Sequence, residues 1–265
     1  MTDDSGTETR TAHVAACQFE PTIGDVDANL AAVRDLAGDL EAGVALAVFP
    51  ELSLTGYDLE VVADLAEPIP GPLTDRAVSL AREVDTTLVL GLPERVGDAV
   101  YNATAVVSPD GLEGVYRKQY AWGDERDVFD AGEGPVTVET SAGTIGLLCC
   151  YDLNFPEAAL EYARRGCDVL AVTAAWRTSF LADWRLFSRT RARDGPCYVV
   201  ASNHTGDQQG RDHAGHSLVA GPDGTVRAEA DERQGVVTAA VPADDLECER
   251  ERNPVRETRR ARGDW

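Results

Sequence analysis

The sequence predicts an α/β fold in which two mixed β-sheets pack face to face and helices cover their outer surfaces. Short apolar runs bounded by turn residues recur along the 265-residue chain, and helical patterns lie between several of them. Strands that alternate with helices indicate an α/β chain. No Gly/Ser linker, repeat or low-complexity tract divides the sequence. So many strands within one domain favour two sheets over one.

The predicted strands are short runs rich in Val, Ile, Leu and Ala. Each is too short for a free-standing helix and apolar enough for a buried strand. Pro-Asp-Gly turns at residues 109–111 and 222–224 are typical of hairpins and favour mixed sheets. The predicted strands are His13–Phe19, Val44–Phe49, Thr87–Leu92, Ala99–Val107, Thr144–Cys150, Asp168–Thr173, Tyr198–Ser202, His216–Ala220 and Gly235–Val241.

Helical patterns separate some of these strands. They predict helices over Val26–Ala42, Leu73–Val84, Pro156–Gly166 and Ala182–Gly195. Residues 1–11 are polar and acidic, and we expect them to form a disordered segment. Residues 12–265 are then a single domain.

The charge of the chain is strongly negative, and its basic residues are almost all arginine. The net charge is −22 at pH 7, and Lys118 is the only lysine among 24 basic residues. An acidic surface with almost no lysine favours adaptation to high salt, where carboxylates keep the surface hydrated although screening is strong. A GC-rich genome or a basic partner is the alternative cause. Nucleic-acid binding is disfavoured, because no basic stripe precedes residues 250–262.

Compartment and cofactor expectations follow from what the sequence lacks. No run approaches the roughly 20 apolar residues of a membrane span, and the N-terminus has no secretory-signal pattern, so we expect a cytoplasmic protein without membrane contact. The six cysteines show no zinc-site spacing, so free thiols and no metal site are expected. Cys17, Cys167 and Cys197 lie in or beside apolar runs and should be core residues.

Glu51 is the first candidate site residue. Pro50 closes the predicted strand that ends at Phe49, which places Glu51 at the carboxyl end of that strand, where α/β proteins bind ligands. The alternative is a solvated loop glutamate.

Cys150 is the second candidate, because an apolar strand runs into Cys149 and Cys150 and then turns toward a helix that Pro156 can open. Such elbows expose a nucleophile beside backbone N–H groups. Successive strand residues point to opposite faces, so only one thiol can face a given pocket. We choose Cys150, nearest the elbow, and expect Cys149 to point into packing. The alternative is that both are core thiols.

Lys118 is the third candidate, since a chain that otherwise uses only arginine keeps an ammonium at this one position. Lysine offers a compact charge where the planar fork of arginine crowds a small pocket. A surviving surface lysine is the alternative. Together the three groups suit cysteine catalysis: a carboxylate takes the thiol proton, and an ammonium stabilises the thiolate and the developing oxyanion.

Three ordered motifs resemble the nitrilase superfamily of carbon–nitrogen hydrolases, which is defined by a Glu–Lys–Cys triad. Phe49–Tyr57 is similar to the glutamate motif, Tyr116–Tyr120 to the lysine motif and Leu148–Glu157 to the cysteine motif. The likeness extends from Val14 to about Pro242. The resemblance favours the amidase-like branch, because the chain lacks a long C-terminal extension.

The resemblance implies a four-layer α-β-β-α sandwich of two mixed sheets, with no cofactor. It also implies homodimers or larger assemblies, with residues 243–265 in the oligomer contact. A second catalytic glutamate is expected at Glu125, with Asp124 as the alternative. The Tyr151 backbone N–H is expected to stabilise the oxyanion, and Trp176 and Tyr57 to line the substrate pocket, although Trp176 could equally be an ordinary core aromatic.

Some residues depart from the family pattern. Asp194 stands where a glutamate is expected, and Tyr120-Ala-Trp122 replaces a more usual His-Leu-aromatic stretch. The four histidines do not suggest a Cys–His pair, and His216 should pack near the site without acting in it. We expect specificity to lie in the loops 58–72, 120–134 and 177–183.

The sequence therefore predicts a thiol hydrolase that cleaves a small amide or N-carbamoyl compound through a thioester. Nitrile hydrolysis is the alternative within enzymes. A non-catalytic acidic interaction protein on the same scaffold is the alternative from another class.

Overall fold

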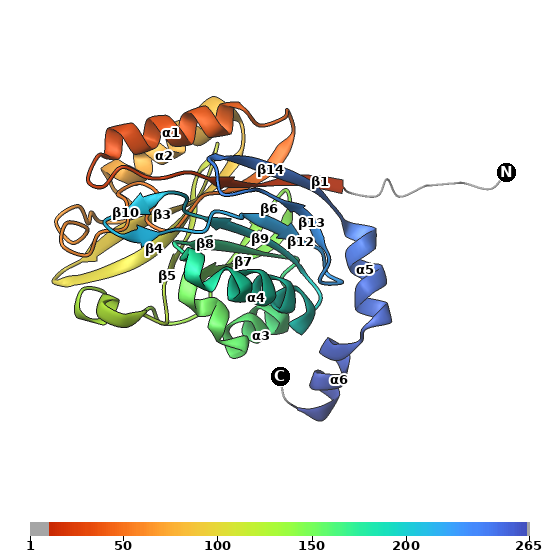
Figure 1. The fold of residues 1–265 in the computed structure, drawn as a ribbon. Helices are drawn as coiled ribbons and strands as arrows, with labels where there is room; N and C mark the ends of the chain where they lie inside the picture. The colour runs from red at the N-terminus through yellow and green to blue at the C-terminus, as the bar shows by residue number, and fades with distance from the viewer. Residues whose placement is uncertain (1–10, 264–265) are drawn as a thin grey trace.

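Two six-stranded sheets form the centre of the computed structural model, which describes residues 11–263 (Figure 1). In order across the first sheet lie β14 (Gly235–Pro242), β1 (Thr11–Gln18), β2 (Val44–Val48), β3 (Thr87–Val96), β4 (Ala99–Ser108) and β5 (Gly111–Arg117). The second sheet holds β13 (Val226–Glu229), β12 (Leu218–Ala220), β9 (Tyr198–Asn203), β8 (Val169–Ala174), β7 (Gly143–Cys149) and β6 (Thr137–Thr140). In each sheet three neighbouring strands are parallel and the outer strands pair antiparallel, so both sheets are mixed.

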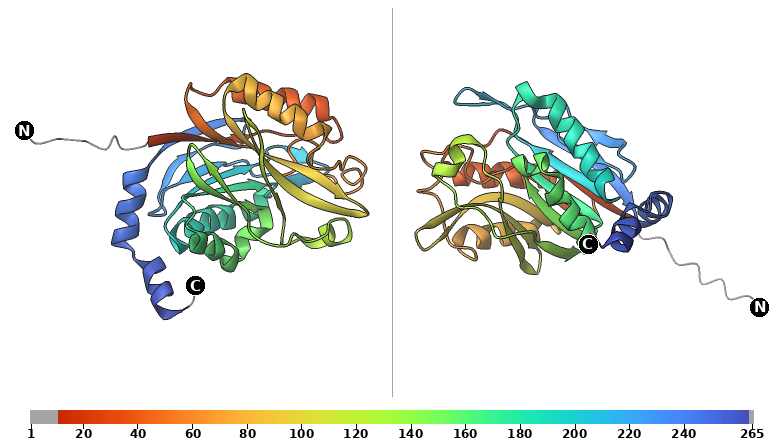
Figure 2. Two further views of the ribbon diagram at one scale, coloured as in Figure 1. Left: turned by 180° about the vertical axis from the view of Figure 1, so that it is seen from behind. Right: turned by 90° about the horizontal axis from the view of Figure 1, so that it is seen from below.

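Two pairs of helices enclose the sheets. Figure 2 shows α1 (Val26–Gly38) and α2 (Pro72–Val84) on the opposite side of the molecule from α3 (Pro156–Arg165) and α4 (Leu181–Asp194). Side-chain alternation along the strands explains the layers. In β1, Ala15 and Cys17 pack with α1 and α2, whereas Val14 and Ala16 pack against the second sheet. The predicted α-β-β-α sandwich is therefore confirmed.

Local signals set the helix ends. The Asp25 side chain caps α1 by accepting a hydrogen bond from the Ala28 N–H at 2.9 Å, and Pro156 opens α3. Helix α3 ends where Gly166 adopts a φ of 89°. The predicted end of α1 at Ala42 was wrong, because Asp39 caps the helix after Gly38.

Several elements were not predicted. Strands β5, β6 and β13 carry too few apolar residues for a run, and β10 (Asp207–Gln208) and β11 (Arg211–Asp212) form a separate two-residue hairpin. Helices α5 (Ala243–Arg252) and α6 (Val255–Arg262) lie beside the sandwich, outside its layers (Figure 1). The predicted oligomer contact through residues 243–265 stays a prediction, and residues 264–265 lie outside the described part.

The N-terminal boundary needs one correction. Residues 1–10, expected to be disordered, lie outside the described residues. Thr11, assigned to the same segment, is instead the first residue of β1 and pairs with Pro242 of β14. Among residues 11–263 there is no helix whose length and apolarity would let it cross a bilayer.

Candidate active site

Glu51 lies in the turn that follows β2 and is fully buried between the two sheets. Its side chain faces the second sheet, where the Ala175 N–H donates to Glu51 Oε2 at 3.0 Å. Gly91 of β3 makes this turn possible, because a Cβ at that position would lie 2.2 Å from the Leu52 nitrogen. A side chain at residue 91 therefore cannot coexist with the present position of Glu51.

Lys118, directly after β5, joins two buried carboxylates. Its Nζ lies 2.7 Å from Glu51 and 2.9 Å from Glu125, and its side chain is 3% exposed. Burial alone would lower the pKa of Lys118, but the charges of Glu51 and Glu125 outweigh it and raise that pKa well above its usual value. The two carboxylates therefore favour the charged form of the ammonium despite its burial.

The two oxygens of Glu51 differ in their surroundings. Oε1 accepts hydrogen bonds from Lys118 Nζ and Asn102 Nδ2, both at 2.7 Å, and from Cys149 Sγ at 3.2 Å. Among donors from residues 11–263, Oε2 accepts only the Ala175 N–H. Burial acts to raise the pKa of Glu51, but Lys118 and the other donors bring it below its usual value. Glu51 is thus an ionised carboxylate whose Oε2 is the freer acceptor.

Cys150 forms the expected elbow after β7. Its φ of 46° turns the chain out of the strand into a short 3₁₀ segment, Cys150–Asn154. Asp152 braces this turn by accepting the Cys149 N–H at 2.8 Å, and it reaches the lysine segment by accepting the Tyr116 hydroxyl at 2.6 Å and the Tyr120 N–H at 3.1 Å. Burial raises the pKa of Asp152 to about 6 against these hydrogen bonds. One buried carboxylate therefore fixes the cysteine relative to the lysine.

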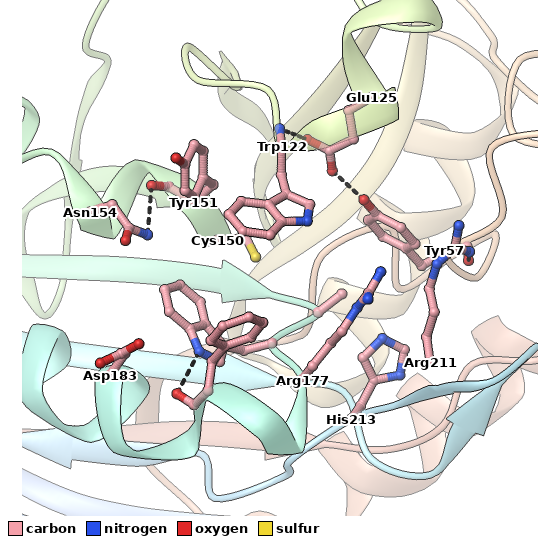
Figure 3. A pocket seen from close by; sticks show the side chains of 13 residues that line it. Tyr57, Trp122, Glu125, Cys150, Tyr151, Asn154, Arg177, Asp183, Arg211 and His213 are labelled. Carbon is pink, nitrogen blue, oxygen red and sulfur yellow. Dashed lines mark hydrogen bonds between the residues drawn. The ribbon is translucent and has the colours of Figure 1, made fainter.

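The Cys150 thiol is the sulfur that faces the pocket in Figure 3. Burial raises the pKa of Cys150 well above its usual value, the carboxylates of Glu51 and Glu125 add to the rise, and Lys118 opposes it. The resting side chain is therefore a protonated thiol. Two carboxylates and one ammonium already carry a charge of −1, so a free thiolate would bring the cluster to −2. If Glu51 takes the thiol proton, the thiolate forms while the net charge of the cluster stays at −1.

Cys149 packs in the core as predicted, but its thiol also contacts the catalytic cluster. It is fully buried in the core between the sheets, but its thiol donates to Glu51 Oε1 and lies 3.8 Å from Asn102 Oδ1. The alternation rule applies to consecutive strand residues. Strand β7 ends at Cys149, which lies on the same face as Ile145 and Leu147, between the sheets. The left-handed backbone of Cys150 follows, and its thiol lines the pocket.

Glu125 is the second buried glutamate at Lys118, as expected from the sequence. It lies in a short 3₁₀ turn, Gly123–Asp127, and accepts the Trp122 N–H at 2.7 Å and the Tyr57 hydroxyl at 2.5 Å. Asp124, the alternative, is exposed. Tyr57 is the last residue of the sequence motif that begins at Phe49, so this motif supplies both Glu51 and the buried hydroxyl that orients Glu125.

One pocket holds Cys150 together with the predicted lining residues Tyr57 and Trp176, and Tyr151 lines it as well. Figure 3 shows the aromatic rings gathered around the sulfur. Trp176 is anchored by its Nε1, which donates to the Phe180 carbonyl at 2.9 Å. The complete lining is Tyr57, Trp122, Glu125, Cys150, Tyr151, Asn154, Ala175, Trp176, Arg177, Phe180, Asp183, Arg211 and His213. Loops 120–134 and 177–183 contribute as expected, whereas residues 58–72 contribute none.

Sequence reasoning missed several residues of the site. The sequence suggests no site role for the histidines, yet His213 lines the pocket and His204 Nε2 lies 2.5 Å from the Glu51 carbonyl oxygen. Arg211 reaches the pocket from the β10–β11 hairpin, whose sequence contains no apolar run that would predict a strand. Asn102 could have been found, since it is a polar residue inside an apolar predicted strand. His216 stays outside the pocket lining, as expected, beside Glu229.

Within the described part of the chain, no three or more His, Cys, Asp or Glu side chains are grouped so that they could hold a metal ion.

Comparison with known proteins finds relatives that match most of the chain. The family model described as carbon-nitrogen hydrolase matches residues 13–249. A nitrilase from Pyrococcus abyssi is 32% identical over 86% of this chain and 88% of its own length. An omega-amidase from Xenopus tropicalis is 30% identical over 83% of this chain and 84% of its own length. The crystal structure of Nit3 from Saccharomyces cerevisiae, a member of the nitrilase superfamily, superposes with a TM-score of 0.85 at 28% identity, covering 93% of this chain and 95% of that one.

Proposed function

Because the chain belongs to the carbon–nitrogen hydrolase family, we propose that it hydrolyses the C–N bond of a small linear amide or N-carbamoyl compound through a thioester on Cys150. The observation that carries the proposal is the buried Glu51–Lys118–Glu125 cluster beside an elbow cysteine that opens into a pocket. The relative named omega-amidase supports an amide as the substrate, and the relative named nitrilase keeps nitrile hydrolysis as the alternative.

The first half-reaction forms the thioester. Glu51 Oε2 takes the Cys150 thiol proton as the sulfur attacks the amide carbonyl carbon. Lys118 and the Tyr151 backbone N–H stabilise the oxyanion of the tetrahedral intermediate. Glu51 then gives the proton to the departing nitrogen, so that ammonia or an amine leaves and the acyl group remains on sulfur.

The second half-reaction regenerates the enzyme. Glu51 removes a proton from water, and the hydroxide attacks the thioester carbonyl at the same oxyanion site. The C–S bond breaks, the acid leaves, and the proton held by Glu51 returns to the Cys150 sulfur. Across both steps one water is consumed for each amide, and the cluster keeps its charge of −1.

A substrate panel tests the proposed function. We expect ammonia release from small linear amides or N-carbamoyl compounds, and slower or no release from the nitriles of the same carbon skeletons. Coupled ammonia detection with purified protein measures both, and Cys150→Ala serves as the blank. Faster turnover of every nitrile than of its amide would replace the proposal by nitrile hydrolysis, and no turnover of any compound would favour a non-catalytic role.

Adaptation to high salt is a further proposal, based on the net charge of −22. Because salt screens the repulsion among exposed carboxylates, the unfolding midpoint should rise by at least about 5 °C between 0.1 M and 3 M KCl, with activity rising in parallel. Thermal unfolding followed by circular dichroism measures the shift. A non-ionic osmolyte at matched osmolality is the control, and full stability in dilute buffer would contradict the proposal. The cytoplasmic location and the homodimer stay predictions.

A further inference from the structure

Two arginines line the pocket that contains the Cys150 thiol (Figure 3). Arg177 follows β8 and Arg211 belongs to the β10–β11 hairpin, so the two side chains reach the pocket from different segments. Neither arginine forms an ion pair with a carboxylate within residues 11–263, although 16 other ion pairs occur there. In a chain with 46 acidic residues, two unneutralised cations beside a nucleophile need a reason.

The fold holds these two arginines at one side of the pocket. The backbone of Arg177 pairs with His213 in an antiparallel bridge. The Arg211 guanidinium lies 5.3 Å from the Tyr57 ring centroid and donates to the Tyr57 carbonyl oxygen at 3.3 Å. Burial, His204 and the charges of both arginines lower the pKa of His213 to about 3, so this histidine is neutral and adds no charge.

The two carboxylates that line the pocket, Glu125 and Asp183, do not neutralise the arginines. Glu125 is already bound by Lys118, the Tyr57 hydroxyl and the Trp122 N–H. Asp183 lines the same pocket but comes from α4, on the other side of the lining in Figure 3. Arg177 and Arg211 therefore leave guanidinium N–H groups available to a ligand.

We propose that Arg177 and Arg211 bind a carboxylate of the substrate, so that the preferred substrates are small amides that carry a carboxylate at the end remote from the scissile bond. This inference rests on the proposed amide hydrolysis and names its substrate class. A guanidinium pairs with a carboxylate through two parallel hydrogen bonds, which fixes the orientation of the ligand as well as its charge. The aromatic side chains Trp122, Tyr151 and Phe180 supply an apolar wall for the carbon chain between the two ends.

Matched substrates test the subsite. We expect kcat/KM for the monoamides of four- and five-carbon dicarboxylic acids to exceed that for the neutral alkyl amides of equal length by about 10-fold or more. In Arg177→Ala this ratio should fall by about 10- to 100-fold, and Arg177→Lys should restore part of it. Arg177→Ala is preferred to Arg211→Ala, because Arg211 also supports Tyr57. Arg34→Ala on α1, which removes an exposed ion pair with Glu83, is the matched control and should leave the ratio unchanged.

A binding measurement separates this inference from the proposed function. Glutarate should bind to Cys150→Ala in calorimetric titrations and should bind about 10-fold or more weakly when Arg177→Ala is added. The subsite is refuted, while amide hydrolysis stands, if the enzyme hydrolyses neutral and acidic amides equally well. The same holds if Arg177→Ala lowers kcat/KM for the two kinds of amide by the same factor. If no amide is hydrolysed but glutarate binds in an Arg177-dependent manner, the hydrolase proposal fails and the carboxylate site stands.

Discussion

Replacement of Cys150 by alanine is expected to lower amide turnover by about 10⁵-fold or more, whereas Cys149→Ala should cost no more than about 10-fold. Removal of a nucleophile eliminates the covalent route altogether. Loss of the Cys149 thiol removes only one of three donors to Glu51 Oε1, because Lys118 and Asn102 remain in place. The two adjacent cysteines therefore form a matched pair of variants.

Ammonia release measures the effect, and alkylation identifies the reactive sulfur. After brief treatment with iodoacetamide, peptide mass spectrometry of the wild-type protein should find the label on Cys150 before the buried Cys17, Cys149, Cys167 and Cys197, with exposed Cys248 as the reference thiol. Circular dichroism checks that both alanine variants remain folded. If Cys149→Ala is as inactive as Cys150→Ala although folded, or if the label appears on Cys149 before Cys150, the nucleophile has been misassigned.

The layered fold could be predicted from the sequence because its buried strands are continuous apolar runs. The parallel strands β1, β2, β3, β7, β8 and β9 are covered on both faces, and all six were predicted at least in outline. Strand β5 was not predicted, because it lies at the edge of its sheet and is half-exposed, so its residues need not be apolar. Helices α5 and α6 were not predicted for a related reason, because they bury few side chains and show no continuous apolar stripe.

The site was predictable where the chemistry demands one residue type and unpredictable where geometry decides. Glu51, Lys118 and Glu125 meet as the motifs suggested. The backbone of Cys150 is left-handed, and the contact between Cys149 and Glu51 joins residues that lie far apart in the sequence. No pattern of hydrophobicity reveals either feature. Arg211 and His213 reach the pocket through a two-residue hairpin too short to leave a periodic signal.

Replacement of Lys118 by arginine, which keeps the positive charge, should still lower kcat by about 10²- to 10⁴-fold. The Lys118 Nζ lies between Glu51 and Glu125 at 2.7 and 2.9 Å in a site that is 3% exposed. A guanidinium is wider and longer, so it must displace one carboxylate or enter the space that the oxyanion occupies. Steady-state ammonia release over a range of amide concentrations separates the change in kcat from that in KM.

The matched variant for this test is Lys118→Met, which removes the charge and keeps the length of the side chain. It leaves Glu51 and Glu125 buried without their counter-ion, so it should destabilise the protein by about 3–5 kcal/mol in denaturant unfolding. Lys118→Arg keeps the counter-ion and should lose much less stability. An arginine variant that is folded and nearly as active as the wild type would show that only charge matters at residue 118. Such a result would remove the reason for a single lysine in an otherwise arginine-only chain, because mutation could then have replaced it without loss.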